Sequence, residues 1–468
     1  MTLLQNDSVQ SSIALFTAWT EAQMAYRDQP GVSVAVIYDQ EIVWSQGFGF
    51  ADVQNQIPAT PQTIYRIASI TKLFTATAVL QLRDAGKLQL DDPVQTHLPW
   101  FTVQNEFEDV PPITIRHLLT HTSGLPREAN FPYWSDSKFP TLQQIQETIG
   151  RQQTAVPTET RWKYSNLAVS LLGAIVAART EQSYESYIQE NILDPLGMDS
   201  TFVSTIPKNH ERLAVGYGRR LPNTPTREVM PFTECNGITP AANMATTVED
   251  LARFAMLQFR AGDGKKARPA GGNQLLKGST LREMHRIHWL DPSWQNGWGL
   301  GFSINRINGK TTIGHGGAVL GYRTLVRLDV ESKIGVVAFT NADDGDPFIY
   351  VDKAFDWIGK AIMKATRPKK DTAVAEESWQ KYVGKYRSQW GDMQILVQNG
   401  ELVALQPNLP DPVPFITKFV PVAEHTFRME APMGFQAPGE LAVFELDDDG
   451  NVVRLRTGDN YSHPVSDW

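Results

Sequence analysis

The chain has 468 residues, of which 41% are hydrophobic and 20% are charged, and its formal net charge is −8 at pH 7. This length predicts two or three domains, and the ordinary balance of apolar and charged residues predicts a globular protein. The acidic charge argues against a nucleic-acid-binding surface, and the single cysteine, Cys235, excludes an internal disulfide and a zinc–thiolate site.

The N-terminal residues 1–12, MTLLQNDSVQSS, lack the basic segment and the long apolar segment of a signal peptide. The longest apolar stretch, residues 167–178, is too short to span a bilayer and is typical of a buried helix. We therefore expect a cytoplasmic protein without a membrane span. A secreted or periplasmic protein whose signal peptide had been removed would carry the same sequence.

The N-terminal segments predict a helix followed by a hairpin. Residues 9–27 have the spacing of an amphipathic helix. Residues 32–39 and 41–50 then have the composition of two strands, with a turn at Asp39 and Gln40.

Ser69 and Lys72 come next, where an apolar run with helical spacing begins in YRIASITKLFTATAVLQL. Residues three apart share a helix face, so the lysine amine is expected beside the serine hydroxyl. A desolvated lysine can take the proton of a serine and so activate it as a nucleophile. A serine on a first helical turn also has backbone N–H groups beside it that can stabilise an oxyanion.

The same spacing occurs twice more, at Ser135 and Lys138 and at Ser378 and Lys381. Ser135 lies among prolines and small polar residues that predict a loop, and Ser378 lies in a polar segment. Only the pair at Ser69 opens a helix-like apolar run, which favours it as the reactive pair.

Residues from about 100 to 235 combine helix-like segments with prolines and loops. Within them, His117 and His121 have a spacing that can chelate zinc on a helix. The segment has no glutamate between the two histidines to act as a base, so we expect no metal site there.

Tyr164, Ser165 and Asn166 stand directly before the apolar run at 167–178. A tyrosine beside a lysine can have its pKa lowered and can move protons between a nucleophile and a leaving group. The alternative is structural: Asn166 would be the N-cap of the helix, with a buried aromatic ring beside it. Further along, Thr246 and Glu249 have the spacing of a capping box.

His315, Gly316 and Gly317 lie within strand-like residues, and the glycines would let a substrate lie against the backbone. The alternative is a tight turn between two strands with an incidental histidine. Alternating strands are expected from about 298 to 340, and a helix at 349–365 closes the domain.

Residues 367–378 have the composition of a linker, and residues 379–468 consist of short alternating runs with hairpin turns at Asn399-Gly400 and Asp449-Gly450. This segment resembles the small lipocalin-like β-barrel domains attached to some serine hydrolases. Such a domain could cap an active site, restrict substrate size, mediate homo-oligomers or simply stabilise the chain.

Taken in order, the three motifs resemble the signature of the serine β-lactamase and penicillin-binding protein superfamily: S-x-x-K, then Y-x-N, then K-T-G or H-x-G. The resemblance is to its class C-like branch of esterases and D-aminopeptidases, and residues 113–126, 241–258 and 296–304 add to it. It implies an α+β, β-lactamase-like fold for residues 1–366, with an antiparallel sheet flanked by helices and an inserted helical subdomain. The active site is then expected where the sheet and the helical subdomain meet.

The resemblance also implies roles for the residues of the motifs. Ser69 would form an acyl-enzyme, Lys72 and Tyr164 would relay protons, and no cofactor or metal would be needed. The other implied roles are an oxyanion hole from the N–H groups of Ser69 and Ala318, an orienting amide at Asn166, and substrate contacts at His315, Gly316 and Gly317.

Two departures bear on the substrate. His315 replaces the lysine that holds a substrate carboxylate in β-lactamases and D,D-peptidases, and Ala242-Asn243 replaces a glycine pair. Because histidine is largely neutral near pH 7, we expect small neutral esters, amides or short peptides as substrates. The alternatives are a β-lactamase or D,D-peptidase, for which Arg323 could bind the carboxylate, and a non-catalytic ligand-binding or scaffold protein.

Overall fold

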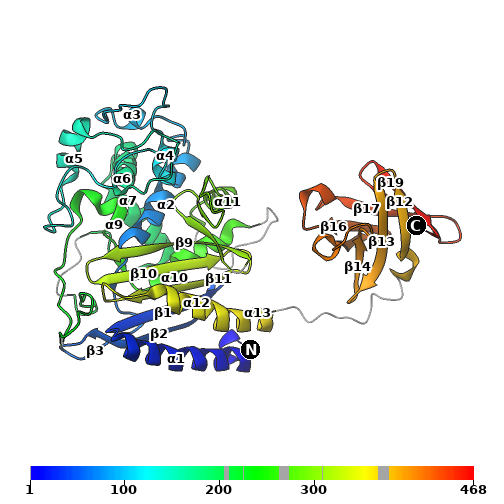
Figure 1. The fold of residues 1–468 in the computed structure, drawn as a ribbon, viewed down its shortest axis with the longest axis horizontal. Helices are drawn as coiled ribbons and strands as arrows, with labels where there is room; N and C mark the ends of the chain where they lie inside the picture. Colours follow the sequence, from blue (N-terminus) through cyan, green and yellow to red (C-terminus); the bar gives the residue numbers. More distant parts are fainter. Residues whose placement is uncertain are drawn as a thin grey trace. The chain divides into compact units, whose positions relative to one another are not determined.

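The computed structural model describes residues 2–204, 210–224, 226–262, 274–307, 309–366 and 379–467. The chain forms two compact units, Met1–Thr366 and Arg367–Trp468 (Figure 1). The predicted linker at 367–378 lies outside the described residues.

A nine-stranded antiparallel sheet forms the centre of the first unit (Figure 1), in the order β3-β2-β1-β11-β10-β9-β8-β7-β6. The predicted hairpin is confirmed, because the first two strands pair on either side of Asp39 and Gln40. β1 also pairs with β11, so both ends of the unit contribute to one sheet. The strands are β1 (Gly31–Tyr38), β2 (Glu41–Asp52), β3 (Ile57–Pro58), β6 (Trp289–Leu290), β7 (Asn296–Trp298), β8 (Ser303–Ile307), β9 (Lys310–Val319), β10 (Tyr322–Asp329) and β11 (Ile334–Thr340); the short strands β4 (Tyr65–Arg66) and β5 (Ala245–Thr246) pair separately.

Both faces of this sheet are covered by helices. Val32, Val34 and Val36 of β1 pack into one apolar cluster, whereas Ala35 and Ile37 pack into another, as the two-residue period of a strand requires. Figure 1 shows the helices from the two ends of this unit, at residues 7–27 and 347–366, on the side of the sheet opposite the helix at residues 71–84. The first cluster includes residues of α1 (Asp7–Arg27), α12 (Pro347–Ala354), η7 (Phe355–Gly359) and α13 (Lys360–Thr366); the second includes residues of α2 (Thr71–Asp84) and α10 (Val248–Gln258).

The helical subdomain surrounds α6 (Asn166–Thr180), which is the apolar run seen in the sequence and is buried over most of its length. Gly173 lets α6 pack tightly, since a Cβ at this position would lie 2.1 Å from Cγ of Pro240. Figure 1 shows α3 to α7 together beyond one face of the sheet. The remaining helices of this unit are η1 (Leu3–Gln5), η2 (Ala68–Ile70), α3 (Val94–His97), α4 (Ile115–Thr120), α5 (Leu142–Thr148), η3 (Ile149–Arg151), α7 (Tyr184–Ile188), η4 (Gln189–Leu193), α8 (Asp194–Leu196), η5 (Asn236–Ile238), α9 (Thr239–Ala242), η6 (Phe259–Ala261) and α11 (Gly278–Met284).

The predicted capping box at Thr246 is wrong by one residue. Thr247 is the N-cap of α10, and its hydroxyl accepts a hydrogen bond from the Asp250 N–H at 3.1 Å. Thr246 instead belongs to β5, and its hydroxyl lies 2.6 Å from that of Thr201. Pairing with β4 therefore sets the start of the helix one residue later.

The second unit contains a closed eight-stranded barrel, as the alternating runs predict. Asn399 and Gly400 both have positive φ, 52° and 73°, which fits a two-residue hairpin turn. The interior is filled by aromatic rings such as Phe419, Phe427 and Phe444, which pack against one another. The strands are β12 (Gly384–Ser388), β13 (Gly391–Gln398), β14 (Glu401–Leu405), β15 (Thr417–Ala423), β16 (Thr426–Glu430), β17 (Leu441–Leu446), β18 (Val452–Thr457) and β19 (Asn460–Val465), with short helices η8 (Gln380–Tyr382), η9 (Val413–Phe415) and η10 (Gly434–Gln436).

Across the described ranges of both units, every helix is too short or too polar to cross a membrane.

Candidate active site

Ser69 lies in η2, the short turn that leads directly into α2. The residue before it, Ala68, has φ of 46° and is buried, so the backbone is held in a conformation that residues other than glycine rarely adopt. One turn later, Lys72 Nζ lies 3.1 Å from Ser69 Oγ. The predicted pair is therefore in hydrogen-bond contact.

Lys72 is buried, with 1% of its surface exposed. Besides Ser69 Oγ, its Nζ contacts Asn166 Oδ1 and the carbonyl oxygen of Ala241, each at 2.8 Å. Burial lowers the pKa of Lys72 to about 7, although the nearby Glu128 carboxylate acts in the opposite direction. Near neutral pH, a large fraction of this amine is therefore unprotonated.

Asn166 is the first residue of α6, and the N-cap is Ser165, whose hydroxyl accepts a hydrogen bond from the Ala168 N–H at 3.0 Å. The structural alternative, Asn166 as the cap, is therefore wrong. Because Ser165 caps the helix, the amide of Asn166 is free to accept from Lys72 and to donate from Nδ2 to Glu128 Oε1 at 2.6 Å.

Glu128 is a site residue that the sequence did not single out. Its Oε1 also accepts a hydrogen bond from Trp134 Nε1 at 3.1 Å, while its buried Oε2 has no partner among the described residues. Burial raises the pKa of this carboxyl group. The available signal was its place directly after the family-like segment 113–126, where Arg127 and Glu128 are adjacent charges before an apolar region.

Tyr164 lies beside both Ser69 and Lys72. Its hydroxyl is hydrogen-bonded to Ser69, and Lys72 Nζ lies 4.8 Å from the centre of its ring. Burial raises the pKa of Tyr164 above its ordinary value, although the hydrogen bond to Ser69 acts in the other direction. The expected lowering of its pKa is therefore wrong, because desolvation outweighs the influence of nearby cations.

His315 lies on β9 and is neutral, because burial and the positive charge of Lys72 lower its pKa to about 3. Its Nδ1 lies 2.6 Å from the carbonyl oxygen of Gly316. A carbonyl oxygen only accepts, so Nδ1 carries the proton and Nε2 carries a lone pair. Nε2 is buried and has no hydrogen-bond partner in the part of the chain that the structure describes.

Gly317 brings β9 against the segment that precedes Ser69. A Cβ at this position would lie 2.1 Å from the carbonyl oxygen of Ile67 and 2.3 Å from Thr324 Oγ1, so any larger residue would force the two segments apart. Ala318 follows it and pairs with Arg323 on β10.

Aromatic rings form one wall of this site. The centre of the Trp298 ring lies 6.2 Å from that of Tyr164 and 5.5 Å from that of His315. His121 packs against Tyr164 with ring centres 4.5 Å apart, and its Nδ1 accepts a hydrogen bond from the Ser165 N–H at 3.2 Å. His121 therefore positions the Tyr164 segment.

The two histidines considered as metal ligands have separate surroundings. α4 ends at Thr120, and His121 has a left-handed backbone with φ of 59°. His117 Nδ1 accepts from the Thr114 N–H at 3.1 Å, and its Nε2 lies 3.1 Å from Glu159 Oε1. His121 therefore lies beyond the end of the helix, and the two histidines are not i and i+4 neighbours within it.

Arg323 does not meet the expectation of a carboxylate-binding residue at the pocket. The hydroxyl of its neighbour Thr324 donates a hydrogen bond to the Ile67 carbonyl oxygen on the site face of the sheet. Because successive side chains of a strand alternate between faces, the Arg323 side chain starts on the other face. The Arg323 guanidinium instead lies 3.2 Å from the carboxylate of Asp343.

Asn243, part of the replaced glycine pair, lies behind the site. Its Oδ1 accepts from the Cys235 N–H at 3.0 Å and from Arg66 Nη2 at 3.3 Å. Two residues earlier, the Ala241 carbonyl oxygen accepts a hydrogen bond from Lys72 Nζ. The amide thus fixes the segment that supplies one of the lysine's acceptors.

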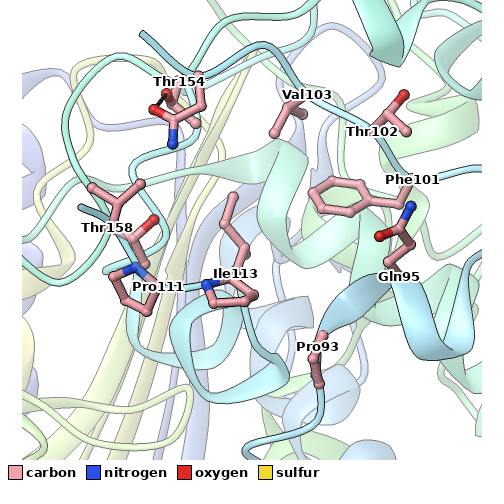
Figure 2. A pocket seen from close by; sticks show the side chains of 12 residues that line it. Pro93, Gln95, Phe101, Thr102, Val103, Pro111, Ile113, Thr154 and Thr158 are labelled. Atoms are coloured by element: carbon pink, nitrogen blue, oxygen red, sulfur yellow. Dashed lines mark hydrogen bonds between the residues drawn. The ribbon is translucent and has the colours of Figure 1, made fainter. Parts of the chain in front are cut away.

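Another cavity, of about 370 Å³, lies elsewhere in the helical subdomain (Figure 2). It is lined by side chains such as Phe101, Ile113 and Thr158, and none of its lining residues is acidic, basic, histidine or cysteine. We therefore place the candidate site at Ser69 and not in this cavity.

The sequence of this chain is similar to those of known proteins. The beta-lactamase family model matches residues 16–358. The chain is 29% identical over 342 residues to Protein flp of Staphylococcus aureus (strain NCTC 8325 / PS 47), an alignment that covers 72% of this chain and 64% of Protein flp. The chain thus spans less than two thirds of the length of this relative.

Solved structures of other proteins are similar as well. An octameric penicillin-binding protein homologue from Pyrococcus abyssi is 25% identical with a TM-score of 0.63, and the alignment covers 96% of this chain and 99% of that one. A D-amino acid amidase from Ochrobactrum anthropi SV3, in complex with L-phenylalanine amide, is 28% identical with a TM-score of 0.60, covering 76% of this chain and 99% of that one.

Proposed function

Because this chain belongs to the beta-lactamase family, whose model matches residues 16–358, we propose that it is a serine hydrolase that forms an acyl-enzyme on Ser69. Its substrates are esters or amides, so that it acts as a carboxylesterase or a D-specific peptidase. The observation that carries this proposal is the set of three oxygen atoms around Lys72 Nζ, from Ser69, Asn166 and Ala241.

A neutral lysine amine has two N–H donors and one lone pair. Two of the atoms around Lys72, Asn166 Oδ1 and the Ala241 carbonyl oxygen, can only accept, and each lies 2.8 Å from Nζ. The two N–H bonds therefore point to these oxygens, and the lone pair points to Ser69 Oγ at 3.1 Å. This arrangement supports Lys72 as the base that removes the serine proton.

Acylation then proceeds as a nucleophilic attack. Ser69 Oγ forms a bond to the substrate carbonyl carbon while its proton passes to Lys72 Nζ. The bond to the leaving group breaks as Tyr164 donates its hydroxyl proton to the leaving atom, and Lys72 returns a proton to Tyr164. The raised pKa of Tyr164 keeps the phenol protonated and able to donate near neutral pH.

The oxyanion would be held by the N–H groups of Ser69 and Ala318. Ser303 pairs with Gly314, and its hydroxyl donates to the Gly314 carbonyl oxygen at 2.8 Å. Peptide groups of alternate residues face the same edge of a strand, so the N–H of Ala318 lies on the edge that Gly314 presents to β8. β8 begins at Ser303, which leaves this part of the edge available to a substrate.

The charge distribution favours substrates without a carboxylate at the His315 position. A neutral His315 offers no cation, and the Arg323 guanidinium lies beside Asp343 on the other face of the sheet. The similarity to a D-amino acid amidase, 28% identical, supports amides of D-amino acids as one class to test.

The test is a hydrolysis panel of a short-chain nitrophenyl ester, D- and L-aminoacyl nitroanilides and a chromogenic cephalosporin. Ser69→Ala should abolish turnover while the protein stays folded. The matched control is Ser135→Ala, because Ser135 has the same spacing to a lysine and is exposed in a loop.

The panel also separates the alternatives. Fast cephalosporin turnover would favour a β-lactamase, and turnover by Ser69→Ala at the wild-type rate would remove Ser69 from the mechanism. Folded protein that is inactive on every substrate would favour a non-catalytic binding protein.

The proposal extends to the organisation of the chain. Residues 1–366 would be the hydrolase domain, 367–378 a linker and 379–468 an accessory barrel. The octameric homologue from Pyrococcus abyssi supports a homo-oligomer, which light scattering of the full chain would test.

A further inference from the structure

A second cavity, of about 350 Å³, lies beside the candidate active site at the β6–β7–β8 end of the sheet. Trp289 and Trp298 are direct partners on β6 and β7, so their side chains lie on the same face of the sheet. Trp162, from the loop before α6, packs against Trp298 with ring centres 5.2 Å apart. We call this cavity the tryptophan pocket; its other lining residues include Asp291, Asn296 and Asn305.

Two walls of the tryptophan pocket are shared with the candidate active site. The ring centres of Trp162 and Trp298 lie 6.0 and 6.2 Å from that of Tyr164. Trp298 also contacts His315, with ring centres 5.5 Å apart. The tryptophan pocket therefore adjoins the side chains that surround Ser69.

The lining combines three indole rings with a single charged side chain, that of Asp291. The Asp291 carboxylate accepts hydrogen bonds from Ser293 Oγ at 2.7 Å and from Asn296 Nδ2 at 3.0 Å. These bonds lower the pKa of Asp291, so it is negatively charged at neutral pH. Indole faces and a carboxylate both attract a cation and repel an anion.

We propose that the tryptophan pocket is a subsite for an aromatic group of the substrate, and that it prefers a positively charged group to a negatively charged one. Its assignment to a substrate rests on the proposed function, whereas its ability to bind such a group does not.

The primary test is therefore a binding experiment that requires no turnover. Phenethylamine, 2-phenylethanol and phenylacetate share an aromatic ring and differ in charge, and each would be titrated into the full chain by calorimetry. We expect the amine to bind about tenfold more tightly than the acid, a difference of about 1.4 kcal/mol, since cation–π and ion-pair contributions favour the amine and oppose the acid. Equal affinity for the amine and the acid would contradict the proposal.

Three variants locate the site of binding. Trp289→Ala and Trp162→Ala should each weaken binding of the amine and the alcohol by about tenfold, which is the usual scale for removing one aromatic contact. Trp162 is 40% exposed in a loop, so its variant folds even if loss of Trp289 disturbs the sheet. The matched control is Trp294→Ala. Trp294 lies in the loop between β6 and β7, is 74% exposed and does not line the pocket. Unchanged affinity in the Trp162 variant would overturn the proposal.

A kinetic comparison then links the pocket to the reaction. Trp289→Ala should lower kcat/KM for an aryl-substituted ester relative to a short-chain ester, mainly through KM, and Trp294→Ala should leave this ratio unchanged. If wild type hydrolyses nothing, the proposed function fails, but charge-dependent binding that needs Trp162 would still establish the pocket as a binding site. A ratio that does not change in an active enzyme would show that the pocket takes no part in substrate recognition.

Discussion

Asn166 Oδ1 lies 2.8 Å from Lys72 Nζ, and this contact exists because another residue caps α6. Ser165 satisfies the N-terminal backbone of the helix, so the amide next to it is not needed there. Since Asn166 donates to Glu128, its amide is fixed with the oxygen toward Lys72. The helix start thus determines which atom of the lysine environment accepts, and with it the direction of the lysine lone pair.

Lys72→Arg should reduce acylation of Ser69 by about 10²–10⁴-fold, the usual contribution of a general base. A guanidinium remains protonated at every pH at which proteins are stable, so it cannot take the serine proton. Single-turnover kinetics with a nitrophenyl ester would measure the acylation rate. The exposed Lys138→Arg serves as the control, and a variant that acylates as fast as the wild type would exclude Lys72 as the base.

The rate of acylation should rise with pH through about pH 7, the pKa to which burial lowers Lys72. The sign follows from the mechanism: below this pH the amine is protonated and has no lone pair, and above it the amine is neutral and active. Glu128→Gln removes a charge that favours protonated Lys72, so the rise should move to lower pH. A pH–rate profile of both proteins measures the shift, and a profile that stays flat from pH 5 to 9 would contradict this role.

Local patterns were sufficient to predict much of the fold. The hairpin at Asp39 and Gln40, the helix after Ser69 and the turn at Asn399-Gly400 depend on neighbouring residues, and each is present. Ser69, Lys72 and Tyr164 were predicted as candidate site residues from the order of their motifs, and the structure brings them into contact.

What the sequence did not indicate depends on contacts between distant segments. The pKa of Tyr164 is raised because its ring is buried against His121, Trp298 and His315, and no local pattern reports that burial. Glu128 meets Asn166 across 38 positions of the chain, and Trp162 meets Trp298 across a larger interval. Pairing of β5 with β4 shifted the cap of α10 from Thr246 to Thr247 for the same reason.

His315→Lys should shift the substrate preference toward molecules that carry a carboxylate. A second amine near Lys72 supplies the cation that the neutral imidazole lacks, and an ion pair with a substrate carboxylate in a partly buried site contributes about 1–3 kcal/mol. The ratio of kcat/KM for a cephalosporin to that for a neutral ester should therefore rise by about tenfold or more. A ratio equal to that of the wild type would show that position 315 does not determine carboxylate recognition.

Gly317→Ala should lower kcat by about 10²–10³-fold, the usual cost of losing one oxyanion donor. The added Cβ would lie 2.1 Å from the Ile67 carbonyl oxygen, so β9 must move away from the segment that carries Ser69. The N–H of Ala318 would move with it and leave the position where the oxyanion forms. Thermal unfolding of the variant would show whether the rest of the domain stays folded.

Gly316→Ala is the matched control, because its Cβ would meet no atom closer than the Thr324 carbonyl oxygen at 3.6 Å, an ordinary contact. Side chains at 316 and 317 point to opposite faces of β9, so the two variants add the same methyl group on the two sides of one strand. If both variants lose activity equally, the effect lies in the flexibility of the strand and not in its distance from Ser69. If only Gly317→Ala loses activity, the close approach of β9 to Ile67 is what positions the oxyanion donor.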